Sequence, residues 1–210
     1  MNNNFEKLIE YFLKFPGIGP RQAKRFALFL AGEDKKFVAD IGQLILKIKE
    51  SVKQCPSCYR FYGADSVRGG AGQCCICSNL NRDNSLLLVV EKDADLQNIE
   101  KSEVYNGKYF VLGGTISLAN GSAKGMAGGL RFRELFEKVK KEKPKEIIMA
   151  LSAAIEGENT SRYVEKILEP LLSKGGQEIK ITRLGRGLST GTELEYSDSA
   201  TIASSLRSRC

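Results

Sequence analysis

Residues 55–77 read CPSCYRFYGADSVRGGAGQCCIC, and this stretch decides how the rest of the chain is organised. It holds two Cys-x2-Cys pairs, Cys55 with Cys58 and Cys74 with Cys77. Two such pairs at this separation can place four thiolates tetrahedrally around Zn²⁺. Four thiolates leave no open coordination position, so the sequence predicts one structural zinc ion per chain and not a catalytic one.

The segment around these pairs cannot fold on apolar contacts alone, because residues 55–85 contain many glycines and few aliphatic side chains. Such a segment needs a bound metal ion or a covalent cross-link to hold its fold. Cys75 lies inside the second pair and is expected to point away from the metal. In a reducing compartment, metal ligands or free thiols are more common than disulfides. The alternative, ordinary thiols in a loop, remains open at this point.

On the N-terminal side of the cysteines, apolar residues recur at helical spacing in three segments, which predicts three helices within residues 1–54. The first two are separated by Pro16-Gly17-Ile18-Gly19-Pro20, and Pro20 suits the first position of a helix. The apolar positions of the three helices are, in turn, Phe5, Leu8, Ile9, Phe12 and Leu13; Ala23, Phe26, Ala27 and Leu30; and Phe37, Val38, Ile41, Leu44, Ile45 and Ile48. The arrangement has the form of a helix-hairpin-helix.

The hairpin carries the features of a phosphate contact. Gly17 and Gly19 allow backbone N–H groups to approach a phosphate at the start of the second helix, where the helix dipole favours an anion. Arg21, Lys24 and Arg25 follow closely and can hold neighbouring phosphates. Such contacts read the DNA backbone and not its sequence. The simpler interpretation is a plain helical turn with solvated basic residues.

On the C-terminal side, the pattern changes to strands alternating with helices, which predicts a parallel sheet covered by helices over residues 85–184. The expected strands are 86–90, 109–112, 146–151 and 178–184, and the expected helices are 130–139 and 160–172. Residues 117–129 are rich in Gly, Ala and Ser and are expected to form a loop. A short last helix is expected within the C-terminal segment 185–210. The fold class is therefore α+β, built from several domains.

Acidic residues follow the ends of two predicted strands. Glu91 ends the first strand and Asp95 comes soon after it, whereas Glu156 and Glu158 follow the strand that ends at Leu151. The ends of parallel strands are where α/β sheets gather ligands. These acids form a partner-binding surface in one interpretation and a Mg²⁺ site for phosphoryl transfer in another. Solvated acids with no specific role are the third possibility.

The bulk composition narrows the function classes. The net charge is +7, from 32 basic and 25 acidic residues, and the excess lies mainly in residues 1–85, where nucleic acid would bind. The chain has no histidine, the commonest general base. It also lacks the G-x4-G-K-[ST] motif of ATP-binding loops. No apolar run reaches membrane-spanning length and the start lacks a signal-peptide core, so we expect a cytoplasmic protein with no membrane partner.

The order of these pieces resembles the RecR family of bacterial recombination mediators, in which a helix-hairpin-helix and a four-cysteine zinc finger precede a Toprim-like α/β domain and a short tail. The similarity runs across nearly the whole chain. The resemblance implies that the helix-hairpin-helix region spans residues 1–54 and the zinc finger residues 55–78. The Toprim-like domain then spans residues 85–184 and the tail residues 185–210. The matching stretches are residues 13–20, 55–58, 74–77, 82–83, 89–91, 111–114, 156–158 and 193–196.

The resemblance implies a DNA clamp in recombinational repair and not an enzyme. Family members form ring-like homo-oligomers, dimers or tetramers, through exchanged terminal segments, and they bind gapped DNA. They act with RecO-type and, in many bacteria, RecF-type proteins to load RecA. Arg21 and Arg25 match the family's basic hairpin positions, and Glu91 matches its Toprim acid, which implies partner binding by the cluster of Glu91, Asp95, Glu156 and Glu158.

Two other functions compete with this one. The first is a Toprim phosphoryl-transfer enzyme, such as a small nuclease or a primase-like protein. Catalytic Toprim domains carry an Asp-x-Asp pair at a strand end, whereas this chain has Glu156 and Glu158 a few residues beyond the strand. The second is a zinc-stabilised scaffold with no DNA role, which salt-dependent DNA binding would separate from a clamp.

Overall fold

The computed structural model describes residues 3–63, 72–116, 123–125, 129–172, 179–185, 187, 188, 191 and 193–207. The chain divides into two compact units, Met1–Lys53 and Gln54–Cys210. Among the described residues, no helix is both long enough and apolar enough to cross a membrane.

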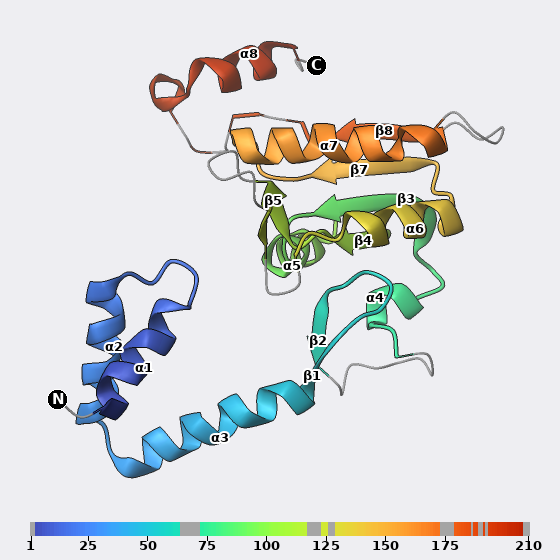
Figure 1. The fold of residues 1–210 in the computed structure, drawn as a ribbon. Coiled ribbons are helices and arrows are strands. Elements are labelled where there is room, and N and C mark those ends of the chain that lie inside the picture. The colour runs from blue at the N-terminus through green and yellow to red at the C-terminus, as the bar shows by residue number, and fades with distance from the viewer. Residues whose placement is uncertain are drawn as a thin grey trace. The chain divides into compact units, whose positions relative to one another are not determined.

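The first unit consists of three helices, as predicted: α1 (Asn3–Leu13), α2 (Pro20–Gly32) and α3 (Lys35–Ser51) (Figure 1). The α1 and α2 helices pack against each other, with the rings of Phe12 and Phe26 5.8 Å apart and the small side chains of Ala23 and Ala27 buried. Asp34 caps α3 by accepting a hydrogen bond from the N–H of Phe37 at 2.8 Å. No residue of α3 is buried, so its apolar side chains remain at the surface of this unit.

The second unit is built on a parallel sheet, which confirms the expected α/β fold. Its strands are β3 (Asp83–Val90), β4 (Gly107–Val111), β7 (Glu146–Ala150) and β8 (Lys180–Arg183), in the spatial order β4-β3-β7-β8. Val89 on the central strand pairs with Phe110 on one side and Met149 on the other. The continuous apolar run at the end of β3 is buried on both faces, as is typical of parallel strands.

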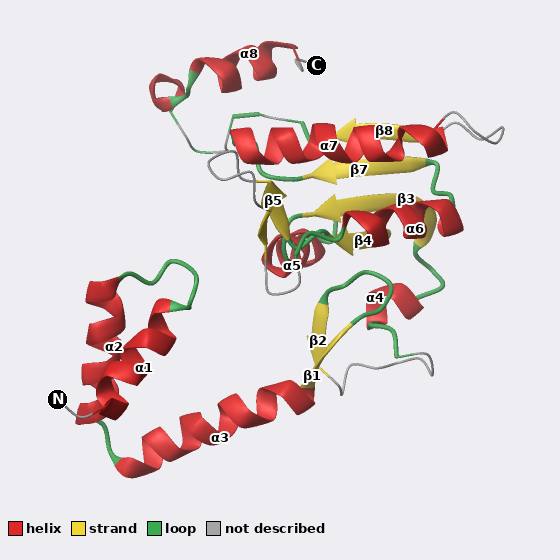
Figure 2. Ribbon diagram, viewed as in Figure 1, coloured by secondary structure: helices red, strands yellow, loops and turns green. Residues whose placement is uncertain are grey.

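Two layers cover the sheet. Helices α6 (Phe132–Glu142) and α7 (Ile155–Leu172) pack on one face, around Leu87, Val89 and Phe110 (Figure 2). Helix α5 (Asp93–Ser102) and the cysteine segment pack on the other face, around Val90 and Tyr109. The cysteine segment therefore shares a core with the sheet instead of standing apart from it.

Helix α5 was not expected from the sequence. It starts at a capping box in which Asp95 accepts a hydrogen bond from the N–H of Lys92 at 3.0 Å, and Leu96 is its buried residue. Helix α7 begins at Ile155, earlier than the expected Thr160. Glu156 and Glu158 therefore lie in the first turn of this helix and not in the loop after β7.

The remaining elements are short. Strands β1 (Val52–Gln54) and β2 (Phe61–Gly63) pair beside the cysteines, and helix α4 (Cys75–Ser78) carries the second cysteine pair. Strands β5 (Gly114–Ile116) and β6 (Ala123–Gly125) form an antiparallel pair. The C-terminal segment contains the 3-10 helix η2 (Leu194–Tyr196) and helix α8 (Ser199–Arg207). Residues 117–122 and 126–128 of the expected loop, and 64–71 of the cysteine spacer, lie outside the described residues.

Candidate functional site

The four predicted metal ligands converge on one point. The sulfur atoms of Cys55, Cys58, Cys74 and Cys77 all lie within 4.8 Å of one another, and Cys58 Sγ lies 3.6 Å from Cys74 Sγ. The first three residues are fully buried, whereas Cys77 is partly exposed. Cys75 is exposed and stands outside this group, as expected from its place inside the second pair.

Each pair sits in a tight backbone turn. In the first, the N–H of Tyr59 donates to the carbonyl of Cys55 and the N–H of Cys55 donates to the carbonyl of Arg60, both at 2.9 Å. Tyr59 takes a left-handed conformation, with φ +63°, which turns the chain back on itself. In the second turn, Cys74 precedes α4 and its N–H points at the sulfur of Cys55 at 3.5 Å. Backbone geometry thus brings both pairs to one centre.

Thiols packed this closely shift one another's pKa values. Hydrogen bonds from Cys58 and Cys74 lower the pKa of the Cys55 thiol, and the bond to Cys55 raises the pKa of Cys58. A buried cluster of this kind cannot hold four thiolates without a cation. A divalent soft metal fits the donor set, because four sulfur ligands at tetrahedral spacing are typical of structural metal sites.

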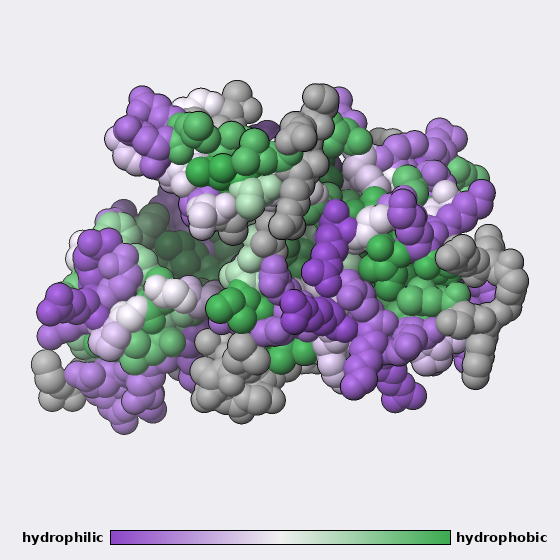
Figure 3. Space-filling view, turned by 90° about the horizontal axis from the view of Figure 1, so that it is seen from above, coloured by the Kyte–Doolittle hydropathy of each residue, from purple (hydrophilic) through white to green (hydrophobic). Residues whose placement is uncertain are grey.

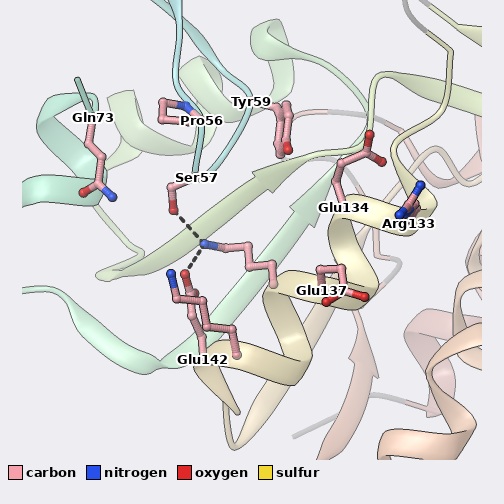
Figure 4. A pocket seen from close by; sticks show the side chains of 10 residues that line it. Pro56, Ser57, Tyr59, Gln73, Arg133, Glu134, Glu137 and Glu142 are labelled. Atoms are coloured by element: carbon pink, nitrogen blue, oxygen red, sulfur yellow. Dashed lines mark hydrogen bonds and ion pairs between the residues drawn. The ribbon is translucent and has the colours of Figure 1, made fainter. Parts of the chain in front are cut away.

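Three hydrogen bonds tie the residues around the first cysteine pair to the α/β domain. The N–H of Val111 donates to the carbonyl of Cys58 at 2.8 Å, and the Phe61 N–H donates to Asp93 at 2.7 Å. The third bond runs from the ammonium of Lys138 on α6 to Ser57 at 2.9 Å. This ammonium also pairs with Glu142, and the two bonds are the dashed lines of Figure 4, which shows the mixed-charge pocket between the segment and α6.

The predicted DNA-contact residues lie together on the first unit. Gly17 has φ +76°, a left-handed conformation in which a side chain would be strained, and Gly19 precedes α2 in an extended conformation. No side chain caps the start of α2, so its first backbone N–H groups face outward. Arg21, Lys24 and Arg25 are exposed on the first two turns of the same helix.

Three of the four predicted partner-binding acids line a single pocket. Glu91, Asp95 and Glu156 border a cavity of about 690 Å³ at the carboxyl end of the sheet. The rest of its lining was not singled out from the sequence, and it includes the apolar residues Ile99, Ala150, Leu151 and Leu184. These residues come from elements far apart in the chain, so only the fold reveals that the acids line the same cavity as apolar side chains.

The acids do not gather as metal ligands do. Glu91 pairs with Lys92 at 3.5 Å, and Asp95 is engaged in capping α5. Glu158 lies on α7 outside the pocket lining. Across the part of the chain that the structure describes, the four cysteines are the only group of three or more ligand residues within coordination reach of one another.

Comparisons with known proteins agree with this architecture. Residues 85–185 match the model of the Toprim domain, and residues 187–210 match the model of the RecR C-terminal region. The recombination protein RecR of Prochlorococcus marinus strain MIT 9312 is 37% identical over 203 residues, covering 97% of this chain and 94% of its own. RecR of Clostridium perfringens strain 13 is also 37% identical, over 204 residues, with coverage of 97% and 94%. The chain therefore belongs to the RecR family of DNA recombination and repair proteins.

Proposed function

We propose that the chain is a multivalent DNA clamp that mediates recombinational repair in the cytoplasm without catalysing a reaction. The observation that carries this proposal is the exposed hairpin, where Gly17 and Gly19 open the start of α2 and two arginines and a lysine follow. The clamp has four parts: the hairpin region 1–54, the metal finger 55–78, the Toprim domain 85–184 and an oligomerising tail 185–210.

In this proposal the hairpin holds DNA by its phosphates. Backbone N–H groups at the start of α2 donate to one phosphate, and Arg21, Lys24 and Arg25 form charge-assisted contacts with its neighbours. One chain offers only a few such contacts, so tight binding needs several hairpins on the same DNA. Assembly into a dimer or a tetrameric ring supplies them through a raised effective concentration.

The four cysteines hold one zinc ion in this proposal, and the residues fit that ion. Their sulfur atoms lie close enough to share one centre, and all four ligand positions are filled by protein. When bound, zinc supplies structural stability. Cys55, Cys58 and Cys74 are buried against the sheet, so they would keep water and competing ligands from the ion.

The acidic pocket is the proposed docking site for a RecO-type partner and, in a related complex, for a RecF-type partner. Both complexes lead to the loading of RecA. Its lining combines acidic and apolar side chains, which suits a basic segment that also carries an apolar side chain. The use of Glu91 in an ion pair and of Asp95 in a helix cap supports docking over Mg²⁺-dependent cleavage.

The test is a salt titration of binding to a labelled gapped duplex, run beside sedimentation of the same samples. The variant Arg21→Ala with Arg25→Ala should bind at least about tenfold more weakly, because each lost charged contact contributes roughly 1.5–3 kcal/mol. Its salt dependence should also be shallower, since fewer counterions are released.

The matched control is Arg162→Ala with Lys166→Ala, which removes the same charge from exposed positions on α7. It should bind DNA nearly as the wild type does. If the hairpin variant binds like this control while its oligomeric state is unchanged, the hairpin is not the DNA site and the proposal fails.

A further inference from the structure

Lys108 on β4 is committed to the backbone of the metal segment. Its ammonium donates to the carbonyls of Ile76 at 3.2 Å, Cys77 at 3.0 Å and Asn79 at 2.9 Å. An ammonium has three N–H donors, so these three bonds use all of them. In a chain with net charge +7, this lysine therefore has no donor left for a DNA phosphate.

The same strand holds the other cysteine pair. The backbone N–H of Val111, three residues along β4, donates to the carbonyl of Cys58 at 2.8 Å. In the sheet, Lys108 pairs with Leu87 and Val111 pairs with Val90 of the central strand β3. Both residues that contact the cysteine segment therefore belong to a hydrogen-bonded strand. One strand of the α/β domain thus fixes a ligand residue from each Cys-x2-Cys pair.

Cys77 is the ligand that needs such an anchor most. The other three ligand residues are fully buried, whereas Cys77, the third residue of the four-residue helix α4, is partly exposed. Water and competing chelators reach an exposed ligand first. A divalent ion with four thiolates also keeps a net negative charge, which a nearby cation offsets.

We infer that Lys108 is a positioning residue for the metal centre. It fixes the backbone at Cys77 and offsets the negative charge of the thiolates, so that retention of the metal depends on the α/β sheet. The inference rests on the proposal that the cysteines bind zinc. The inference also means that Lys108 does not contribute to the DNA-binding surface.

The first experiment measures the rate at which zinc passes from the purified protein to a chromophoric chelator. Lys108→Met should release zinc roughly tenfold faster than the wild type, the size of effect typical of groups that support metal ligands. The control is Lys180→Met, which removes the same charge from an exposed position on the strand β8. This control should release zinc at the wild-type rate.

The two proposals fail in different ways. A wild-type protein without zinc would overturn the zinc assignment before any variant is compared. A wild-type protein with about one zinc per chain, together with equal release from Lys108→Met and Lys180→Met, would overturn the role of Lys108 alone.

The second experiment separates the charge and the hydrogen bonds of Lys108 from its bulk. Lys108→Arg keeps a cation with several donors and should restore slow release, whereas Lys108→Gln keeps donors without charge and should release zinc at an intermediate rate. If Lys108→Met fails to fold, the comparison of Arg with Gln carries the test. Equal, wild-type rates for both would then contradict the inference.

A spectroscopic readout reports on the ligand itself. With Co²⁺ in place of zinc, the thiolate-to-cobalt absorption depends on the donor strength and position of each sulfur. Lys108→Met should change this absorption and Lys108→Arg should return it towards that of the wild type. An unchanged spectrum in Lys108→Met would show that the side chain does not act on the metal centre.

Discussion

Cys74 and Cys75 are adjacent in the chain but have different surroundings. Cys74 is fully buried among the other three ligands, and Cys75 is exposed on the first position of α4. The turn that ends at Cys74 directs its sulfur inward, and the next residue then points outward. Chemically identical side chains thus have different roles, and single substitutions can separate these roles.

Cys74→Ser should lose the metal, whereas Cys75→Ser should keep about one zinc per chain, because a hydroxyl replaces a ligand in the first case alone. Elemental analysis of the purified proteins measures this directly. Cys74→Ser should also increase amide hydrogen exchange across the described parts of residues 55–85. Loss of zinc in Cys75→Ser would mean that the ligand assignment is wrong.

Glu91 is the acid whose charge reversal should affect docking most. The residue borders the acidic pocket with a side chain that is 18% exposed, and this side chain forms an ion pair with Lys92. Glu91→Lys should weaken binding of a RecO-type partner about tenfold or more by placing a cation where a basic segment docks. Titration calorimetry measures the affinity.

The control for this change is Glu169→Lys, at an exposed position on α7 outside the pocket lining. It makes the same charge change and should leave partner affinity within about twofold of the wild type, as is usual for exposed charges. Binding to gapped DNA should be nearly unchanged in both variants. An equal loss of DNA binding in Glu91→Lys would contradict the assignment of this pocket to protein partners.

At the scale of elements, helix α5 is joined to the sheet by an ion pair. Arg82, just before β3, donates to both oxygens of Glu100 at 2.7 and 2.5 Å. Burial alone would raise the pKa of Glu100, but the hydrogen bonds from Arg82 and its positive charge outweigh burial and hold this pKa below its ordinary value of 4.5. Ionised Glu100 therefore stabilises the folded state above about pH 4.5, and this contribution is lost as the pH falls through its lowered pKa.

Glu100→Gln should thus lower the free energy of unfolding by about 2 kcal/mol at pH 7, the usual size for charged hydrogen bonds. The difference between variant and wild type should shrink as the pH falls below about 4.5. Urea unfolding at several pH values measures it, and taking the difference removes effects common to both proteins, such as acid release of metal. A difference independent of pH would exclude the ion pair as its cause.

Helix α7 begins against the backbone of the preceding loop, and Gly157 permits this contact. A Cβ atom at this position would lie 1.9 Å from the carbonyl oxygen of Ser152. Gly157→Ala should therefore displace the first turn of α7, together with Glu156, at a cost of about 1–3 kcal/mol in unfolding free energy. Partner binding should weaken with it.

Gly42→Ala offers a control of the opposite sign. Gly42 is also helical, on α3, and a Cβ there would meet no atom within 4 Å. Alanine should stabilise that helix by about 0.5–1 kcal/mol. Denaturant midpoints measure both changes, and a neutral effect of Gly157→Ala would show that this turn is not held by the close contact.

The elements that could be predicted from the sequence are those with a strong local pattern. The continuous apolar run of β3 and the spacing of the cysteine pairs gave the sheet and the metal cluster. Helix α5 was missed because Leu96 is its only buried residue, which leaves little periodicity. Nothing local distinguishes Lys108 from other lysines, because its partners lie about 30 residues away in the chain.

At the scale of the whole molecule, the first unit has an exposed apolar surface that we expect another protein chain to cover. Leu44, Ile45 and Ile48 on α3 are 67%, 63% and 54% exposed, although they share one face of the helix. On the face of the molecule drawn in Figure 3, hydrophobic residues likewise reach the surface among hydrophilic ones. Contiguous exposed apolar residues of this kind mark sites of association. In the proposed clamp, another copy of the chain covers this face.

Ile45→Asp should therefore dissociate the oligomer, because it places a charge in the buried centre of the proposed contact. Gln43→Asp is the matched control, since Gln43 lies on the opposite face of the same helix and receives the same charge. Sedimentation should show smaller species for Ile45→Asp alone. Its affinity for gapped DNA should fall as well, even though Arg21 and Arg25 are intact, because separate hairpins lose the gain from binding together. An oligomer that survives Ile45→Asp would exclude this face from the assembly, and a monomer that still binds DNA tightly would contradict the clamp.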